Sequence, residues 1–206
     1  MISIKQIFTS TLSTIFFCGA PLAAQNVVGT TVVDGREVTL YQDQTWAFKQ
    51  ASTEKCEQLT KFLNFCGDPF VWRKNPPPNQ AILAQYTPDP QLYLQYIPEN
   101  VGSNAGINYD IFRQGVLQYA GNASGVTAKS VPVLLSGNVV VSGLEGKTLV
   151  YIINVSGMKV VFQNTMIIQN DWALQIQTYE TGVTNLTEKH KKHHADSTAL
   201  TELSTV

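Results

Sequence analysis

Three apolar, β-branched runs between Thr148 and Glu180 form the clearest alternation of hydrophobic and polar segments in the chain. They cover residues 148–155, 159–168 and 172–180. Ser156-Gly157 and Gln169-Asn170-Asp171 separate them, and such short polar segments are typical of the tight turns that join antiparallel strands. The pattern therefore predicts an antiparallel meander.

The last run alternates between two kinds of side chain. Trp172, Leu174 and Ile176 alternate with Ala173, Gln175 and Gln177. Successive side chains of a strand point to opposite faces of its sheet. We therefore expect Leu174 to be buried between the sheet and a helix, and Gln175 to lie on a partly wet face.

Other segments of the chain predict a hairpin, one further strand and three helices. Residues 80–97 predict a hairpin, and residues 131–142 predict a strand. Between residues 107 and 123 the positions Phe112, Val116, Tyr119 and Ala123 recur every three or four residues, which predicts an amphipathic helix laid on the sheet. Residues 53–65 and the charged tail after Thr184 also have helical features. The order of elements predicts an α+β fold, an antiparallel β-sheet with flanking helices.

The first 24 residues have the composition of a secretory signal peptide. Lys5 is their single base, an apolar segment follows from Ile7 to Phe17, and small residues lead up to Ala24. A buried N-terminal helix and a lipid attachment at Cys18 are the alternatives, but bulky aromatic residues precede Cys18. We therefore expect cleavage after Ala24 and a periplasmic or secreted protein.

Residues 25–50 predict a separate β-hairpin element. Asp34-Gly35 and the polar segment 42–44 are turn signals between strand-forming residues. Trp46 is either a ligand platform or the core residue of this hairpin, and buried aromatic residues dominate small cores. We therefore expect Trp46 to be buried.

Cys56 and Cys66 remain after removal of the signal peptide. Two cysteines of an exported protein usually pair, so we expect a disulfide between them. A continuous helix over residues 53–65 would separate the two sulfurs by about 15 Å, however. We therefore expect this helix to end near Phe62 and the following residues to fold back.

Charge and length restrict the function further. The chain has a formal net charge of −1, and charged residues make up 14% of it without a strong excess of either sign. Proteins that bind nucleic acid need clustered bases, so we expect no nucleic-acid partner. No apolar run after the signal peptide reaches the roughly 18 residues that span a bilayer, so we expect the mature protein not to span a membrane.

His190, His193 and His194 form the one cluster with metal-like spacing. On a helix they lie on one side, where imidazoles could share a zinc, nickel or copper ion. The alternative is structural: a stripe made of Leu186, His190, His193, Ser197 and Leu200 would dock on the sheet, with lysines solvated opposite. We favour the structural alternative and expect a solvated helix without a tight metal site.

The order of several segments resembles an exported bacterial family of unknown function. These segments are 89–99, the helix that follows, Val131-Pro-Val-Leu134, 146–151, 161–165 and 173–179. Their layout is similar to the Mog1/PsbP superfamily, and the resemblance covers residues 53–203. It implies an antiparallel sheet flanked by helices and a role in binding other proteins rather than in catalysis.

No catalytic arrangement stands out in the sequence. No Gly-x-Ser-x-Gly frame and no glycine-rich phosphate loop is present, so we expect neither an enzyme nor a cofactor. The leading hypothesis is a non-enzymatic exported protein that binds another, unknown protein. The second hypothesis is a protein that binds a small ligand or a metal, which a deep pocket with converging polar groups would favour.

Overall fold

The computed structural model describes residues 26–33, 36–48 and 56–204, which belong to two compact units, Met1–Gln50 and Ala51–Val206. In the first unit, β1 (Val27–Val33), β2 (Arg36–Tyr41) and β3 (Trp46–Phe48) form a three-stranded antiparallel sheet. Trp46 is 58% exposed, and the expectation that it fills the core is wrong. The small Val38 is buried instead, with 1% exposure.

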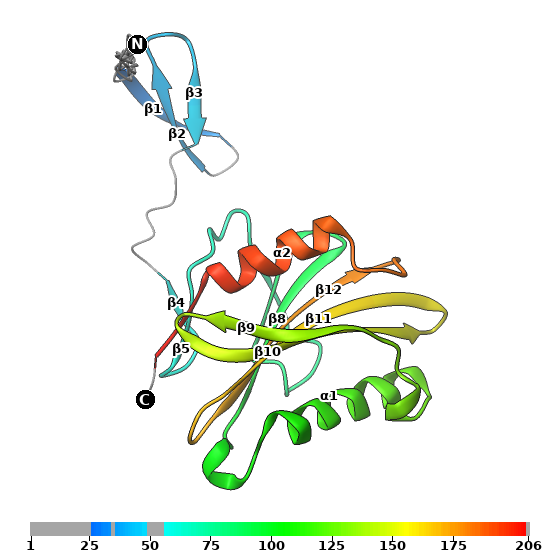
Figure 1. Ribbon diagram of the computed structural model, residues 1–206. Helices are drawn as coiled ribbons and strands as arrows, with labels where there is room; N and C mark the ends of the chain where they lie inside the picture. Colours follow the sequence, from blue (N-terminus) through cyan, green and yellow to red (C-terminus); the bar gives the residue numbers. More distant parts are fainter. Residues whose placement is uncertain (1–25, 34–35, 49–55, 205–206) are drawn as a thin grey trace, which may run out of the picture. The chain divides into compact units, whose positions relative to one another are not determined.

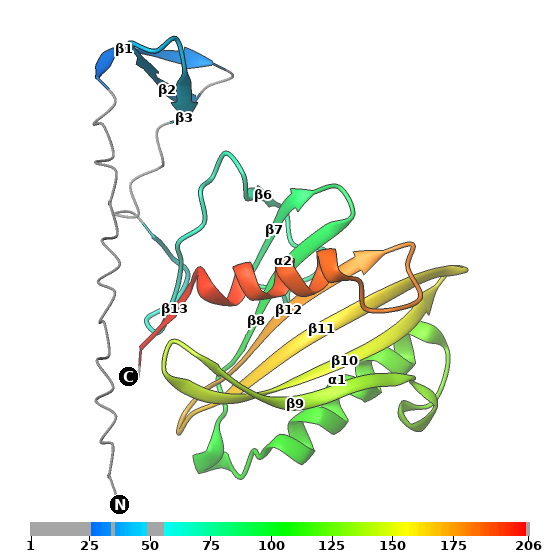
Figure 2. The same cartoon turned by 45° about the horizontal axis from the view of Figure 1, so that its top comes forward.

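The second unit is built on a seven-stranded antiparallel sheet in the order β6-β7-β8-β12-β11-β10-β9, which Figure 2 labels strand by strand. Its strands are β6 (Arg73–Asn75), β7 (Ala84–Asp89), β8 (Leu92–Glu99), β9 (Val133–Val141), β10 (Leu144–Val155), β11 (Met158–Ile168) and β12 (Ala173–Thr181). The predicted meander is confirmed, because β10, β11 and β12 pair consecutively and antiparallel. The fold is α+β.

Local turn chemistry explains the two tight hairpins of this sheet. Ser156 and Gly157 between β10 and β11 both have positive φ, 51° and 86°, and Ser142 and Gly143 between β9 and β10 repeat the arrangement. Two-residue turns with positive φ at both positions match the right-handed twist of paired strands. A glycine at the second position adopts this conformation without a steric penalty.

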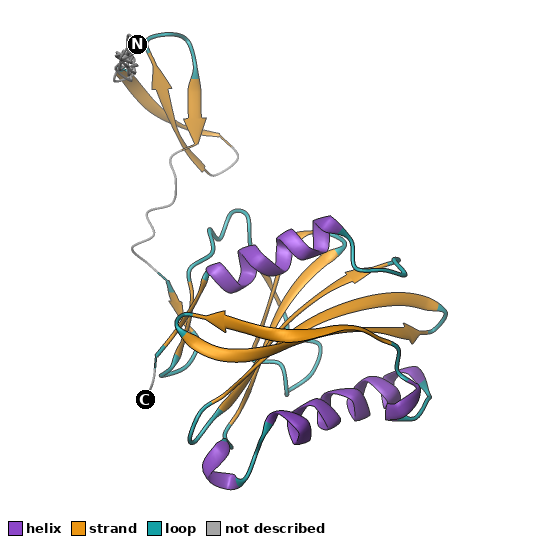
Figure 3. Cartoon of the chain, viewed as in Figure 1, coloured by secondary structure: helices purple, strands orange, loops and turns teal. Residues whose placement is uncertain are grey.

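Two helices lie on opposite faces of the sheet, as Figures 1 and 3 show. Helix α1 (Tyr109–Ser124) packs on β10 and β11, whereas α2 (Glu188–Ala199) packs on β12 and β8. Asn108 caps α1 by accepting hydrogen bonds from two backbone N–H groups, and Gly125 ends it with a φ of 68°. Neither of these helices, the α-helices of the described residues, combines the length and apolarity needed to cross a bilayer.

The predicted helix α1 is rotated relative to the expected face. Val116, Leu117 and Ala120 are its buried apolar residues, whereas Tyr119, expected against the sheet, is 67% exposed. The expected position of Tyr119 is therefore wrong. The reason is that α1 lies over one side of the sheet only, so that its flank is not covered by β8 and β12.

The predicted helix over residues 53–65 is also wrong for the residues that the structure describes there. From Cys56 on, the chain forms β4 (Glu57–Gln58) and β5 (Leu63–Phe65), and β5 pairs with β13 (Thr201–Leu203) near the C-terminus. Leu63 and Phe65 are buried in the core beneath α2. Burial and pairing with a distant strand thus override the local helical signals.

Candidate functional site

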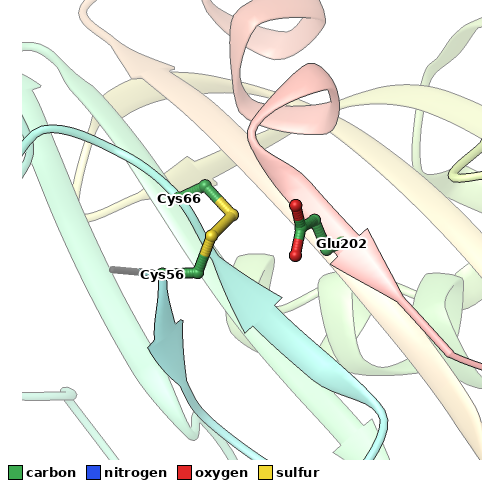
Figure 4. Close-up of side chains that lie close together, drawn as sticks. All are labelled: Cys56, Cys66 and Glu202. Carbon is green, nitrogen blue, oxygen red and sulfur yellow. A yellow bond between two sulfur atoms is a disulfide. The ribbon is translucent and has the colours of Figure 1, made fainter. Parts of the chain in front are cut away.

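Cys56 and Cys66 form a disulfide, as predicted, with their Cα atoms 4.1 Å apart. They lie at the start of β4 and the end of β5, which the antiparallel pairing brings together. Glu202 of β13 lies beside the disulfide, and Figure 4 shows its carboxylate next to the two sulfurs. The two sulfurs are bonded to each other, so they offer no thiolates to a metal ion.

The three histidines of α2 are buried rather than solvated, which corrects the expected solvated helix. Their exposed fractions are 0% for His190 and 5% for both His193 and His194. The expected stripe is nevertheless the one that docks on the sheet, and the lysines of α2 are exposed on its other side.

Hydrogen bonds to the sheet explain how these imidazoles are tolerated in the interior. Thr178 Oγ1 lies 3.0 Å from His190 Nε2 and 2.8 Å from His194 Nδ1, and Thr165 Oγ1 lies 2.8 Å from His194 Nε2. Burial lowers the pKa of His190 to about 4, and burial lowers the pKa of His194 to about 3. Both rings are therefore neutral at physiological pH.

His193 has a different environment at the edge of the same layer. Its ring stacks on Trp72, with centroids 5.2 Å apart, and its Nε2 donates to the carbonyl of Tyr93 over 3.1 Å. Within the described residues, the three imidazoles do not converge as a group of metal ligands. His190 Nε2 and both ring nitrogens of His194 bind threonine hydroxyls, and His193 Nε2 binds a backbone carbonyl. His190 Nδ1 is buried and has no partner among the described residues.

A cavity lies on the other face of the sheet, beside α1. Its volume is about 880 Å³, within the range of roughly 300 to 1,000 Å³ typical of small-molecule sites. The strands β8, β10, β11 and β12 form its floor, α1 forms one wall, and residues 78–82 form the other. It exists because α1 packs on β10 and β11 and leaves β8 and β12 uncovered on this face.

The wall of the cavity is mostly apolar. From α1 it receives Ile111, Phe112, Gly115, Val116 and Tyr119. No described atom lies within 4 Å of the position that a Cβ of Gly115 would take, so the glycine faces open space. Asn79 Nδ2 donates a hydrogen bond to the Tyr119 hydroxyl over 3.5 Å, which links the two walls.

An aromatic row crosses the floor from strand to strand. Tyr93, Tyr179, Phe162 and Tyr151 occupy paired positions on β8, β12, β11 and β10. Tyr93 and Tyr179 stack with centroids 4.6 Å apart, and Phe162 lies 5.0 Å from Tyr179 and 5.3 Å from Tyr151. Burial raises the pKa of Tyr151 and of Tyr179, so these phenols stay neutral.

An amide row runs next to the aromatic row. Gln85, Gln95, Gln177 and Asn164 occupy paired positions across β7, β8, β12 and β11. Gln95 donates to Gln85 over 2.6 Å, and Gln177 donates to the Tyr151 hydroxyl over 3.1 Å. The floor therefore places hydrogen-bonding groups inside an otherwise apolar cavity.

The sequence revealed this floor only in part. The partly wet face predicted for β12 is the one that lines the cavity with Ala173, Gln175 and Gln177. On β8, Tyr93, Gln95 and Ile97 line the cavity and alternate with the core residues Leu92, Leu94 and Tyr96. The polar Gln95 between apolar neighbours is the sequence signal that could have identified this second strand of the floor. The apolar flank of α1 did not predict the cavity, because the same pattern is expected of a helix face that packs fully on a sheet.

Comparisons with known proteins leave the family of the chain open. No family model and no curated protein matches its sequence. A structure from Bacteroides thetaiotaomicron matches with a TM-score of 0.44 and 8% identity, over 70% of this chain and 46% of that one. The present chain thus spans less than half of that protein.

Two further solved structures are similar over most of their own length. LpqN, described as involved in cell envelope biogenesis of Mycobacterium tuberculosis, matches with a TM-score of 0.41 and 16% identity, over 69% of this chain and 83% of LpqN. A protein of unknown function from Pseudomonas aeruginosa, PA94, matches with a TM-score of 0.36 and 13% identity, over 77% and 89% of the two chains. We therefore infer the role of the cavity from its own residues.

Proposed function

We propose that the protein binds a small apolar molecule in the cavity between α1 and the sheet, without catalysing a reaction. The observation that carries this proposal is a cavity of about 880 Å³ with apolar walls and a row of amides in its floor. Apolar pockets with a few converging polar groups are typical of ligand sites. This favours the second of the two hypotheses that the sequence left open.

Binding of the neutral, apolar dye N-phenylnaphthylamine tests the proposal. Its fluorescence increases in an apolar environment, so titration of the full mature chain gives a dissociation constant. The variant Gly115→Leu places a side chain in the open space beside this glycine and should weaken binding at least about tenfold, because it fills part of the cavity. Its stability should stay equal or rise by up to about 1 kcal/mol, since leucine is a better helix former than glycine.

The matched control is Gln114→Leu, which adds the same side chain to the neighbouring, exposed position of α1 outside the cavity. This variant should bind the dye as the wild type does. If neither the wild type nor Gln114→Leu bound the dye, or if both leucine variants lost binding equally, the proposed function would be wrong.

The edge of the sheet supports a second candidate function, the binding of another protein. Among the described strands β9 pairs only with β10, and it contains no charged residue and no proline. Leu134, Leu135 and Val140 on it are 43%, 51% and 65% exposed. An apolar strand edge without charges is a template for a further strand. We propose that an extended, uncharged segment of a partner protein adds antiparallel to β9.

A charged residue on this edge tests the second candidate. Leu134→Lys should abolish capture of a partner from periplasmic extract, because a lysine opposes strand addition at an edge. In the purified complex of the wild-type protein, the partner should protect the backbone amides of β9 from hydrogen exchange. Gly115→Leu is the control and should leave capture unchanged. A partner retained by Leu134→Lys, or protection elsewhere than β9, would contradict strand addition.

Export and ancestry are part of the proposal. The disulfide supports an oxidising, extracytoplasmic location, since such bonds are rare in the cytosol. The N-terminal 24 residues lie outside the described residues, and their role as a signal peptide stays a prediction. The same holds for a Mog1/PsbP-like layout of residues 53–203, with which a sheet carrying one helix on each face agrees.

A further inference from the structure

The polarity of the cavity floor changes along the direction of the strands. At one end lie Glu99 and Gln175 beside the apolar Ile97 and Ala173, and the aromatic row lies in the middle. The other end is formed by Ile153, Val155, Met158 and the uncharged Thr181. From Ala173 to Thr181 along β12 the floor extends over about 26 Å, at a rise of ~3.3 Å per residue. The cavity is therefore amphipathic along its length.

Among the described residues that line the cavity, Glu99 is the only acid, and none is a lysine, an arginine or a histidine. No described residue forms an ion pair with Glu99. A carboxylate with no cationic partner repels a second negative charge and attracts a donor or a cation. The polar end of the cavity thus discriminates between ligands by charge.

The amides at the same end leave hydrogen-bonding capacity unused. Asn164 donates to Gln175 Oε1 over 2.7 Å, and Gln177 donates to the Tyr151 hydroxyl. Each glutamine so uses one end of its amide within the floor, and its other end has no partner among the described residues. Gln175 is a diagonal neighbour of Glu99 across the β8–β12 pair, close enough for one ligand group to reach both.

We infer that the ligand is an amphiphile whose polar end is a hydrogen-bond donor without negative charge, such as a hydroxyl, an amide or an amine. The head group donates to the Glu99 carboxylate, and a hydroxyl or an amide can also accept a hydrogen bond from the free Nε2 of Gln175. The apolar chain runs past the aromatic row toward Ile153 and Met158. This inference rests on the proposed function and adds the chemical class and the orientation of the ligand. Anionic amphiphiles such as fatty acids are disfavoured, because no cation compensates their charge.

Three probes with one chain and different head groups test this inference. Dodecylamine, dodecanol and dodecanoate are each used to displace N-phenylnaphthylamine from the full mature chain. We expect dodecanoate to bind at least about tenfold more weakly than dodecanol, and dodecylamine to bind at least as tightly as dodecanol. Glu99→Lys should reverse the order of the amine and the carboxylate, and Glu99→Gln should remove the preference for the amine.

The control for net charge is Glu145→Lys, a substitution of an exposed carboxylate that does not line the cavity. It should keep the wild-type order of the three probes. Circular dichroism verifies that each variant is folded, and Glu99→Gln still decides the question if Glu99→Lys does not fold.

The outcomes separate this inference from the proposed function. The head-group assignment would be wrong if dodecanoate bound as tightly as dodecanol. It would also be wrong if the order of the three probes were the same in the wild type and in both Glu99 variants. In either case the cavity would remain a ligand site. Failure of the dye and of all three probes to bind would refute the proposed function itself.

Discussion

Leu174 and Gln175 are neighbours in β12 whose side chains lie on opposite faces of the sheet. Leu174 is 0% exposed in the core beneath α2, so Leu174→Ala should lower the free energy of unfolding by roughly 2 to 5 kcal/mol. Urea denaturation measures this loss. A loss below about 1 kcal/mol would mean that the position is not in a packed core.

Gln175 is more costly to replace than its partly wet position suggests. It accepts a hydrogen bond from Asn164, which is 0% exposed and whose Oδ1 already has no partner. Gln175→Ala should therefore cost about 1 to 3 kcal/mol, since it leaves a buried donor unsatisfied. Lys159→Ala on the neighbouring strand, an exposed position, should cost under about 0.5 kcal/mol in the same denaturation experiment.

The buried histidines make the stability of the folded protein decrease at acidic pH. Their pKa values are lowered in the folded state, to about 4 for His190 and about 3 for His194, from an ordinary value of 6.5. Below pH 6.5 the unfolded chain binds protons that the folded protein does not. The stability contributed by the neutral rings is therefore complete above that pH and is lost as the pH falls toward the folded values.

We expect the free energy of unfolding to drop by roughly 5 kcal/mol between pH 7 and about pH 4.5, about half of it from each of the two rings. Urea denaturation at a series of pH values measures this slope. Replacement of both residues, His190→Gln with His194→Gln, should reduce the slope even if it lowers the stability at pH 7. An unchanged slope in the double variant would assign the acid sensitivity to other groups. Asp89, Glu180 and Asp196 are the acids facing His193, the third ring of this layer.

At the scale of elements, the disulfide joins β4 to β5 at a point where each strand is short. The double variant Cys56→Ser with Cys66→Ser should lose about 2 to 4 kcal/mol of stability, because the crosslink restricts the unfolded chain. Free-thiol titration of the unfolded, unreduced chain that begins after Ala24 should find no thiol. Two reactive thiols per chain would contradict the pairing.

At the scale of the whole molecule, ligand binding and folding are linked. A ligand that occupies the cavity only in the folded state stabilises that state, by about 2.7 kcal/mol at a concentration of 100 times its dissociation constant. Dodecanol should therefore raise the melting temperature of the wild type in a concentration-dependent way. The variant Gly115→Leu should show a smaller rise at each concentration, because its binding is weaker. A similar rise in both proteins would indicate binding outside the cavity.

Local chemistry in the sequence was sufficient to predict the central elements. The two-residue turn Ser156-Gly157, the β-branched runs beside it and the alternation in β12 each depend on neighbours within a few residues. The ends of helix α1, an asparagine cap and a glycine, also depend only on residues close to them in the sequence. The predicted export and the number of cysteines were sufficient to predict the disulfide.

Contacts between distant parts of the chain decided the rest. Residues 63–65 form a strand because they pair with residues 201–203, and no local pattern in the sequence predicts that distant partner. The histidine stripe of α2 was predictable, but its burial depends on Thr165 and Thr178 of the sheet. The cavity exists because α1 lies over β10 and β11 only, and the offset of a helix on a sheet is set by packing, not by the sequence of either element alone.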